Sequence, residues 1–298
     1  MKVLVVGGIT GHVAGALSRI RAPDLDLDVR GRPQVDLADP ESLKAAMTIA
    51  EPKVVICAGA YTAVDTAEEE AGLAMQINAA GPAALARACA EASVPLVHVS
   101  TDYVFSGEKR EPYVETDPTG PISVYGRTKL LGEQGVIAAG GRHVILRISG
   151  VYAPRGKNFV RTMLRLAGTR NEIGVVDDQS GRPTYAPDVA EALVAVARRV
   201  GHDRDAPSGV FHMTGQGDVC SWRSFADEIF RLSADRGGPF ARVKPITTAE
   251  YPTPARRPAN SALDCSRVAA VYGVRLPPWR ESLARCIDGV ADNNWDVA

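Results

Sequence analysis

Short runs of strand-forming residues alternate with longer stretches of helical character along the first half of the chain. Strands are predicted at residues 2–6, 27–29, 53–57, 94–100 and 143–147, with a further one at 209–213. Helices are predicted between them at residues 13–21, from residue 40 onward, at 75–92 and at 124–138. Because strands and helices alternate at this spacing, the pattern predicts an α/β protein with a Rossmann-type, doubly wound parallel sheet.

This alternation weakens beyond residue 150. Helical patterns cover residues 159–166 and 187–200, but residues 244–260 hold four prolines, which lack the N–H donor that a helix needs. We therefore predict two domains. Residues 1–150 with 184–215 form the Rossmann domain, and residues 151–183 with 216–298 form a smaller C-terminal lobe.

Composition and charge narrow the class of protein. Of the 298 residues, 45% are hydrophobic and 23% are charged, which excludes a disordered or fibrous chain. The formal net charge of -1 predicts that neither nucleic acid nor a membrane surface is a partner. No apolar run approaches the roughly 20 residues that cross a bilayer, so we expect a cytoplasmic protein. The five cysteines show no CxxC spacing and are expected to be free thiols, with no metal site.

A glycine-rich turn follows the first strand. Residues 8–14 fit the pattern G-x-x-G-x-x-(G/A) between a strand and a helix. Glycine there lets a pyrophosphate approach the backbone closely, and the start of the helix offers unpaired N–H groups. The turn therefore predicts dinucleotide binding, with a purely structural turn as the alternative. His12 is expected to belong to this cofactor loop rather than to act as a base.

The end of the second strand bears on the choice of cofactor. An acidic residue there usually binds the ribose diol of NAD, whereas arginine accommodates the 2′-phosphate of NADP. Asp28 lies within the strand, while Arg30 and Arg32 follow at its end. The two arginines favour NADPH, with NADH as the alternative if both are solvated loop charges. Asp36 follows closely and is placed to flank the adenine.

Tyr125 and Lys129 form a YxxxK pair on a predicted helix. Side chains four positions apart lie on one face of a helix, so both can reach one cleft. A lysine ammonium beside a phenol lowers the pKa of the tyrosine toward neutrality and makes it a usable proton donor to a carbonyl under reduction. Thr101 follows the fourth strand, at the edge where ligands bind to open α/β sheets. Its hydroxyl can therefore hydrogen-bond the reacting oxygen.

Taken with these motifs, the chain resembles the dTDP-4-dehydrorhamnose reductase family, which belongs to the extended short-chain dehydrogenases/reductases. The resemblance covers nearly the whole chain and is most specific in the strings TDYVF at 101–105, GRPT at 181–184, RPANS at 257–261 and LPPW at 276–279. It implies the NADPH-dependent reduction of the C4 ketone of dTDP-4-dehydro-L-rhamnose to dTDP-L-rhamnose, in dTDP-rhamnose biosynthesis. It also implies that the Rossmann domain binds NADP and that the smaller lobe binds substrate.

The resemblance assigns roles to individual residues. The implied catalytic residues are Thr101, Tyr125 and Lys129. The implied cofactor-binding residues are Gly8, Thr10, Gly11, His12, Val13, Arg30, Asp36, Leu37, Ala60, Tyr61, Thr62 and Val99, together with Tyr125 and Lys129. The implied substrate-binding residues are Thr101, Asp102, Gly150 and Arg182. The expected partner is a dTDP-sugar, the expected assembly a monomer or homodimer, and a magnesium ion has no support in the sequence.

Gly150 departs from the family pattern. Where the family typically has Ser-Trp-Val-Tyr, this chain has glycine in place of tryptophan, and glycine cannot supply aromatic surface to a substrate. This leaves two alternatives open. One is a different nucleotide-sugar 4-ketoreductase or an epimerase. The other is a non-catalytic NADP-binding regulatory subunit, although the intact Tyr125 and Lys129 disfavour it.

Several other conspicuous residues are expected to be structural. Residues 68–70 are predicted to form a solvated acidic helix face. The strand histidines His98, His143 and His212 are predicted to lie in the core, and Trp222 and Trp279 to pack the smaller lobe. Arg256 and Arg257 either attract the diphosphate of a nucleotide or are surface charges.

Overall fold

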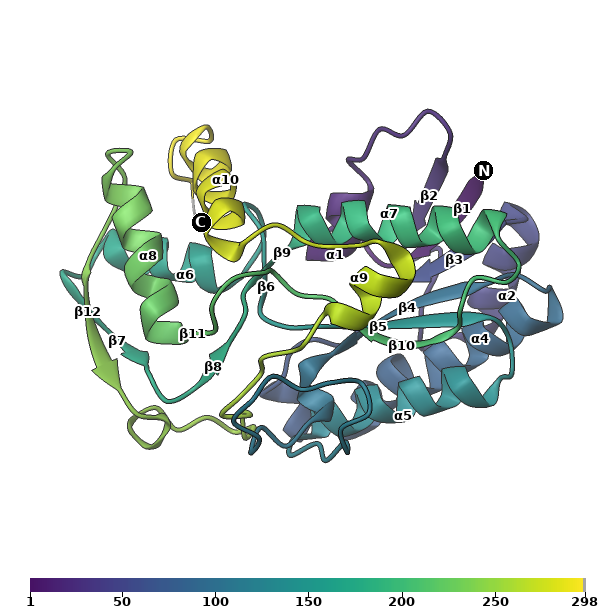
Figure 1. Ribbon diagram of the computed structural model, residues 1–298, viewed down its shortest axis with the longest axis horizontal. Helices are drawn as coiled ribbons and strands as arrows, with labels where there is room; N and C mark the ends of the chain where they lie inside the picture. The colour runs from purple at the N-terminus through teal and green to yellow at the C-terminus, as the bar shows by residue number, and fades with distance from the viewer. Residues whose placement is uncertain (297–298) are drawn as a thin grey trace.

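The apolar runs of the first half of the chain fold into one parallel sheet in the larger of two lobes (Figure 1). The computed structural model describes residues 1–296. The strand order is β2-β1-β3-β4-β5-β10, and every pairing is parallel. The strands are β1 (Lys2–Val6), β2 (Asp26–Arg30), β3 (Val54–Cys57), β4 (Leu96–Thr101), β5 (His143–Ile148) and β10 (Gly209–His212). The predicted doubly wound Rossmann-type sheet is confirmed.

Helices cover both faces of this sheet, which explains why its strands are apolar on both sides. On one face, Val3 and Val5 pack with α1 (His12–Leu17) and α7 (Ala186–His202). On the other face, Leu4 and Val6 pack with α2 (Pro40–Ala50), α4 (Gly81–Glu91) and α5 (Val124–Ala138). Both layers leave the carboxyl ends of the strands uncovered.

The helix predicted at residues 75–92 is present without a gap. It consists of α3 (Ala71–Met75), the π-helical turn η2 (Gln76–Ala80) and then α4, with Pro82 near its start. A Cβ atom at Gly81 would lie 2.2 Å from the carbonyl oxygen of Leu37, so the helix packs closely against a distant loop. The helix predicted at 13–21 ends early, at Leu17.

The smaller lobe is built from short strands and three helices. Its strand pairs are β6 (Val151–Tyr152) with β9 (Thr184–Tyr185), β7 (Glu172–Val176) with β12 (Arg242–Ile246), and β8 (Ser180–Gly181) with β11 (Cys220–Ser221). Its helices are α6 (Phe159–Ala167), α8 (Trp222–Ala234) and α10 (Trp279–Ala291). Short 3₁₀ turns complete the chain at η1 (Thr66–Glu68), η3 (Asp102–Val104) and η4 (Thr248–Glu250).

The two lobes have separate cores. Phe225 and Trp279 lie in the core of the smaller lobe, and Trp222 stacks against Phe159 at its edge, so both tryptophans pack as predicted. Helix α9 (Ser266–Tyr272) belongs by sequence to the predicted C-terminal lobe, but its Val268 is buried in the core of the large sheet. The domain boundaries stay a prediction.

The strand histidines lie in the core as predicted, with one exception. His98 and His212 are fully buried, whereas His143 is partly exposed because it is the first residue of β5. All five cysteines are free, and four of them are buried.

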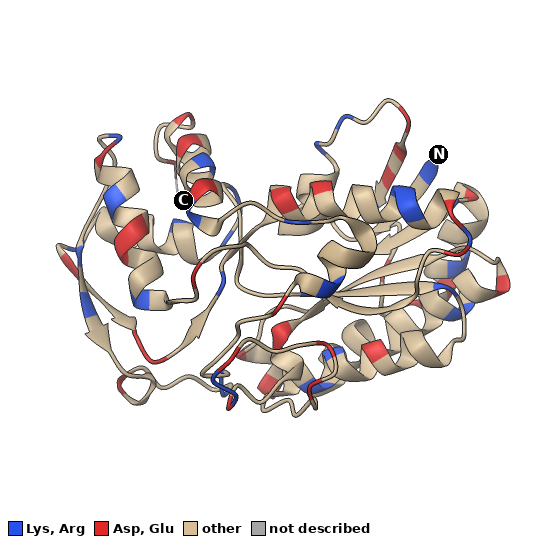
Figure 2. Ribbon diagram, in the orientation of Figure 1, with Lys and Arg blue, Asp and Glu red and all other residues tan. Residues whose placement is uncertain are grey.

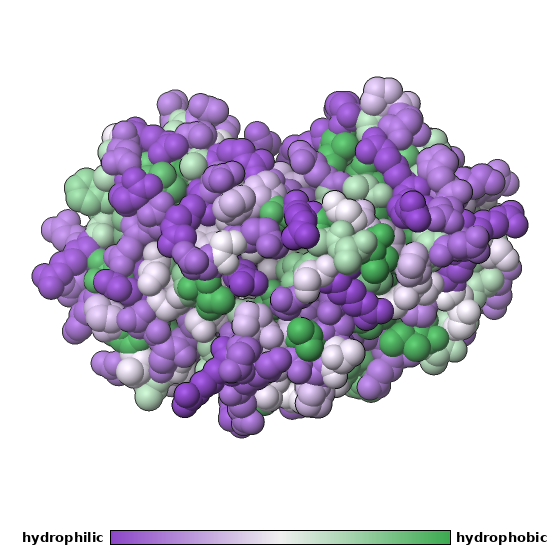
Figure 3. All heavy atoms as spheres, viewed as in Figure 1, coloured by the Kyte–Doolittle hydropathy of each residue, from purple (hydrophilic) through white to green (hydrophobic). Residues whose placement is uncertain are grey.

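Positively and negatively charged residues are interspersed along the chain in both lobes (Figure 2), and on the face seen in Figure 3 hydrophobic residues are scattered among hydrophilic ones. Among residues 1–296, no helix is long and apolar enough to cross a membrane.

Candidate active site

A cleft of about 830 Å³ opens where the strands of the large sheet end. It lies at the switch point between β1 and β3, where strand order reverses and where open α/β sheets bind their ligands. The predicted site residues that line it are Gly8, Thr10, Gly11, His12, Val13, Asp36, Leu37, Ala60, Thr62, Val99, Thr101, Asp102, Tyr125, Lys129 and Gly150. Three predicted residues, Arg30, Tyr61 and Arg182, do not line it.

The glycine turn forms one wall of the cleft. Its backbone is closed by a hydrogen bond from the Gly11 N–H to the Gly8 carbonyl oxygen, at 2.8 Å. A Cβ atom at Gly7 would lie 3.1 Å from the backbone nitrogen of Gly59, and one at Gly15 would lie 2.4 Å from the Ile9 carbonyl oxygen. The turn therefore needs glycine at 15, one residue beyond the Ala14 that the sequence pattern pointed to. This cradle leaves the backbone accessible to a pyrophosphate.

The two arginines after β2 differ in what they contact. Arg30 donates two hydrogen bonds to Asp28, at 2.9 and 2.7 Å, and this ion pair raises the pKa of Arg30. Arg32 lines the cleft together with Asp36, which caps the following turn through the Ala38 N–H. The cation that faces the ribose end of the cleft is therefore Arg32.

The loop after β3 is held in place by Asn78, which sequence reasoning missed. Its side chain accepts a hydrogen bond from the Tyr61 N–H at 2.8 Å and donates to the Tyr61 carbonyl oxygen at 3.1 Å. It also donates to the Thr128 hydroxyl on α5. The Tyr61 side chain turns away from the cleft and donates to Glu70. Tyr61 therefore anchors this loop through its backbone, and its side chain does not line the cleft.

Helix α5 begins beside the cleft because three contacts fix its first turn. The Ser123 side chain accepts a hydrogen bond from the Gly126 N–H, and the Glu68 carboxylate accepts one from the Val124 N–H at 2.8 Å. A Cβ atom at Gly126 would lie 2.2 Å from the Tyr103 carbonyl oxygen, so the helix rests directly on the turn that follows β4. Glu68 is thus a helix cap, and the prediction that residues 68–70 form a purely solvated face is wrong.

Thr101, Tyr125 and Lys129 come together at the end of β4. Tyr125 lies beside Thr101, and its ring packs edge-on against Tyr103 with centroids 5.4 Å apart. Burial raises the pKa of Tyr125 to about 12, and the neighbouring Thr101 hydroxyl opposes this. The predicted lowering of that pKa toward neutrality by Lys129 is wrong in this structure. The Lys129 ammonium instead donates to the Val99 carbonyl oxygen at 2.8 Å.

Asp102 is buried beside these groups. Its Oδ1 accepts a hydrogen bond from the Thr101 hydroxyl at 3.2 Å, the hydroxyls of Ser261 and Ser149 lie nearby, and Oδ2 has no hydrogen-bond partner among the described residues. Burial raises the pKa of Asp102 to about 6, and the three hydroxyls oppose this. Ser149 and Ser261 were not among the predicted site residues.

The substrate side of the cleft meets the smaller lobe at Gly150. This glycine has a φ of +56°, and a Cβ atom there would lie 3.7 Å from the indole ring of Trp222. Arg182 lies away from the cleft and donates to the carbonyl oxygens of Gly217 and Leu263. Its role in the structure is to join loops of the smaller lobe.

The remaining candidate cations and metal ligands have other partners. Arg257 forms an ion pair with Asp65 at 2.8 Å, which links the proline-rich segment to the loop after β3, while Arg256 is exposed. Among residues 1–296, no group of three or more His, Cys, Asp or Glu side chains could hold a metal ion.

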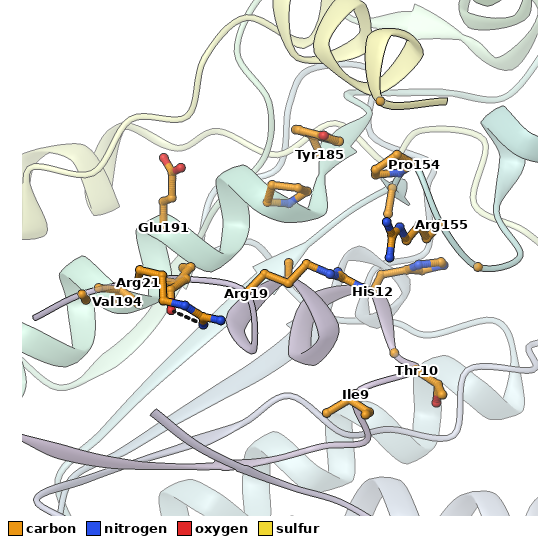
Figure 4. Close-up of a pocket in the computed structure, with 18 of the residues that line it drawn as sticks. Ile9, Thr10, His12, Arg19, Arg21, Pro154, Arg155, Tyr185, Glu191 and Val194 are labelled. Atoms are coloured by element: carbon orange, nitrogen blue, oxygen red, sulfur yellow. Dashed lines mark hydrogen bonds between the residues drawn. The ribbon is translucent and has the colours of Figure 1, made fainter. Parts of the chain in front are cut away.

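A second, larger groove of about 1200 Å³ lies behind the glycine turn, between α1, α7 and α10. Figure 4 shows the side chains of Arg19 and Arg155 directed toward His12 in this groove. Thr10, Gly11 and His12 line both cavities, so the turn is the wall between them. Tyr125 and Lys129 face only the smaller cleft, which is therefore where the chemistry lies.

A tyrosine and a lysine four residues apart on one helix line one cleft of a parallel sheet together with a glycine-rich turn. This arrangement is characteristic of the extended short-chain dehydrogenases/reductases, a class of oxidoreductases.

Comparison with known proteins gives the family. The model of the RmlD substrate binding domain matches residues 1–291. A dTDP-4-dehydrorhamnose reductase of Sinorhizobium fredii is 46% identical over 95% of this chain and 96% of its own, and one of Burkholderia thailandensis is 42% identical over 96% and 98%. The chain belongs to the dTDP-4-dehydrorhamnose reductase family.

Solved structures agree with this assignment. The dTDP-4-dehydrorhamnose reductase of Bacillus anthracis, in complex with NADP, superposes with a TM-score of 0.88 at 33% identity, covering 96% of this chain and 98% of its own. The corresponding reductase of Clostridium acetobutylicum gives 0.89 at 36% identity, covering 98% and 100%. A Thermus thermophilus UDP-glucose 4-epimerase shares the fold at 23% identity and a TM-score of 0.78, covering 98% of this chain and 99% of its own.

Proposed function

We propose that the protein uses NADPH to reduce the C4 ketone of dTDP-4-dehydro-L-rhamnose to dTDP-L-rhamnose. The observation that carries this proposal is the meeting of Thr101, Tyr125 and Lys129 at the end of β4, within the cleft walled by the glycine turn. Membership of the dTDP-4-dehydrorhamnose reductase family supports the same reaction. Asp102 and Gly150 are the residues proposed to contact the sugar.

The cleft fits the cofactor. The close approaches at Gly7 and Gly15 make a cradle that side chains would fill, and Arg32 offers a cation for a 2′-phosphate. When bound, NADPH supplies the hydride that is added to the carbonyl carbon. Lys129 is placed to bind the nicotinamide ribose, and Leu37 lines the adenine end.

The protein's part in the reaction is to hold and deliver a proton. Because burial keeps the Tyr125 phenol protonated, it can donate that proton to the carbonyl oxygen as the ketone becomes an alcohol. Thr101, which lies beside Tyr125, can hydrogen-bond the same oxygen. The cationic Lys129 stabilises the phenolate that remains after the transfer.

The test is the substitution Tyr125→Phe, which removes the acid and keeps the ring. We expect turnover with the 4-keto sugar nucleotide, followed by NADPH oxidation, to fall at least about a hundredfold. NADPH binding, followed by fluorescence, is expected to change little. Tyr251→Phe is the matched control, because Tyr251 is exposed and remote from the cleft lining. Near-normal turnover of Tyr125→Phe would refute the assignment.

Gly150 supports one second candidate, a reductase or epimerase of another nucleotide sugar. The glycine leaves space against Trp222 in which a different hexose could lie. A panel of keto-sugar nucleotides with product identification separates the candidates, and NADPH binding without turnover of any of them would favour a regulatory subunit. We further propose that the enzyme acts in the cytoplasm. We propose that it is a monomer or homodimer, and light scattering of the purified protein would determine which.

A further inference from the structure

A buried ion pair lies directly behind the proposed catalytic residues. Glu133 on α5 accepts hydrogen bonds from Arg147 on β5, at 2.9 Å from Nε and 2.6 Å from Nη2. The two side chains are 2% and 5% exposed, so the pair is shielded from solvent. Tyr125, Lys129 and Glu133 are spaced four residues apart and therefore lie along one face of α5.

The same carboxylate also binds the strand that carries Thr101. The Ser100 hydroxyl donates to Glu133 Oε1 at 2.5 Å. Ser100 is the register partner of Arg147 on the neighbouring strand, and it follows Val99, whose carbonyl oxygen accepts from Lys129. Glu133 thus joins α5, β4 and β5 at the level where the Lys129 ammonium is anchored.

Of the groups around Lys129, Glu133 is the carboxylate that raises its pKa. The others are Cys57 on β3, His98 on β4, Asp102 in the turn η3 that follows β4, Tyr125 on α5, Arg147 on β5, and His212 on β10, whose Nε2 lies 3.5 Å from Arg147 Nη1. Burial raises the pKa of the Cys57 thiol to about 11 and lowers the pKa of both histidines, so these three groups are neutral.

Lys129 shares this buried region with the Glu133–Arg147 ion pair, and Asp102 adds a second carboxylate above its pKa of about 6. Burial lowers the pKa of Lys129, and the neighbouring Cys57 and Glu133 oppose the effect. Because the thiol is neutral, the carboxylate supplies the negative charge that opposes it. Arg147 shares that carboxylate, so it reduces the stabilisation available to the lysine. The charge state of Lys129 therefore depends on both members of the ion pair.

We propose that Glu133 is a positioning residue for the reduction: it holds the Lys129 ammonium charged and in place against β4, and Arg147 sets how strongly it does so. This inference rests on the proposed function, because it assumes that the lysine assists Tyr125. A purely structural brace would instead leave the protonation of Lys129 unchanged when its charges are removed.

The first experiment measures the lysine itself, without cofactor or substrate. Protein labelled with ¹³C at lysine Cε is titrated by NMR, and the Lys129 signal is assigned with Lys129→Arg. We expect Glu133→Gln to lower the pKa of Lys129 by about one unit or more, and Arg147→Gln to raise it. The double variant E133Q/R147Q is expected to fall between the two, near the unmodified protein.

Activity supplies the second readout. The alkaline limb of the kcat profile is expected to move to lower pH in Glu133→Gln and to higher pH in Arg147→Gln. Glu228→Gln is the matched control, because Glu228 forms an ion pair of similar length with Arg231 on α8, in the other lobe. This control is expected to leave both the Lys129 titration and the limb unchanged.

Two outcomes overturn the inference: an unchanged pKa of Lys129 in Glu133→Gln, or shifts of the same sign in both single variants. If Glu133→Gln does not fold, Glu133→Asp is used instead, because aspartate keeps the charge on a side chain shorter by one methylene. The pKa of Lys129 must then fall by a smaller amount. The NMR result does not depend on the substrate. A failure of the proposed function would appear as normal turnover in Tyr125→Phe, or as no turnover of the 4-keto sugar nucleotide by the unmodified protein, so the two failures are distinguishable.

Discussion

Gly126 allows a direct test of how closely α5 must approach the turn after β4. In Gly126→Ala the new Cβ atom would lie 2.2 Å from the Tyr103 carbonyl oxygen, while Cβ contacts under 3.0 Å are essentially never seen. The helix and the turn must therefore separate by about 0.8 Å or more, since the clash is with backbone. Tyr125 precedes Gly126 in the first turn of α5 and Thr101 lies at the end of the strand before Tyr103, so the distance between their side chains increases.

A displacement of about 1 Å at reacting groups costs on the order of a hundredfold in rate. We therefore expect kcat of Gly126→Ala to fall by roughly that factor, and overpacking to lower stability by about 1 to 3 kcal/mol. The measurements are steady-state NADPH oxidation and urea unfolding. A loss of stability would indicate the clash, because alanine in a helix without such a clash is favoured over glycine by about 1 kcal/mol.

Gly72→Ala is the matched control. Gly72 lies in the helix α3, and nothing lies within 4 Å of a Cβ atom built there. It is expected to keep normal kcat and to gain stability from the helix propensity alone. If Gly126→Ala also kept normal kcat and gained stability, the close approach of α5 would not matter for the site, and the reasoning would be wrong.

Two further predictions concern charge. Because burial raises the pKa of Asp102 to about 6, the folded protein holds a proton that the unfolded chain releases between about pH 4 and pH 6. Asp102 therefore lowers the free energy of unfolding by up to about 3 kcal/mol as pH rises through that window. Urea unfolding of Asp102→Asn should lack this pH-dependent loss of stability. An identical dependence of stability on pH in the variant would contradict the prediction. Arg32→Ala should raise the KM for NADPH at least about tenfold with little change in the KM for NADH. Arg30→Ala should leave the ratio of these two KM values nearly unchanged, because Arg30 is bound to Asp28. Equal effects of the two substitutions on this ratio would argue against the division of roles.

The large sheet was predictable because each of its strands is an apolar run bounded by turn residues. The strand predicted at 143–147 is β5, His143–Ile148, and the first strand is identical in prediction and structure. The close contact between Gly81 and the Leu37 carbonyl oxygen was not predictable, because Leu37 is distant in the sequence and no local propensity reports it.

The chemistry of the cleft was visible only in part. Strand order placed Thr101 beside Tyr125, because the ends of parallel strands meet at one edge of the sheet. The pairing of Arg30 with Asp28 depends on side-chain direction along β2, which the sequence pattern did not resolve. The Glu133–Arg147 pair carried a usable signal, since Glu133 continues the four-residue spacing and Arg147 lies in an apolar strand.

The position of β10 in the sheet has a consequence for synthesis of the protein on the ribosome. β10 pairs with β5, yet about 60 residues of chain separate them. This segment contains β6, α6, β7, β8 and β9 of the smaller lobe and all of α7. Until residue 212 has emerged, β5 is paired only with β4, and its other edge has no partner strand. A nascent chain that stops near residue 150 therefore exposes a strand edge able to pair with another copy, and the large sheet is complete only after residue 212 has been made.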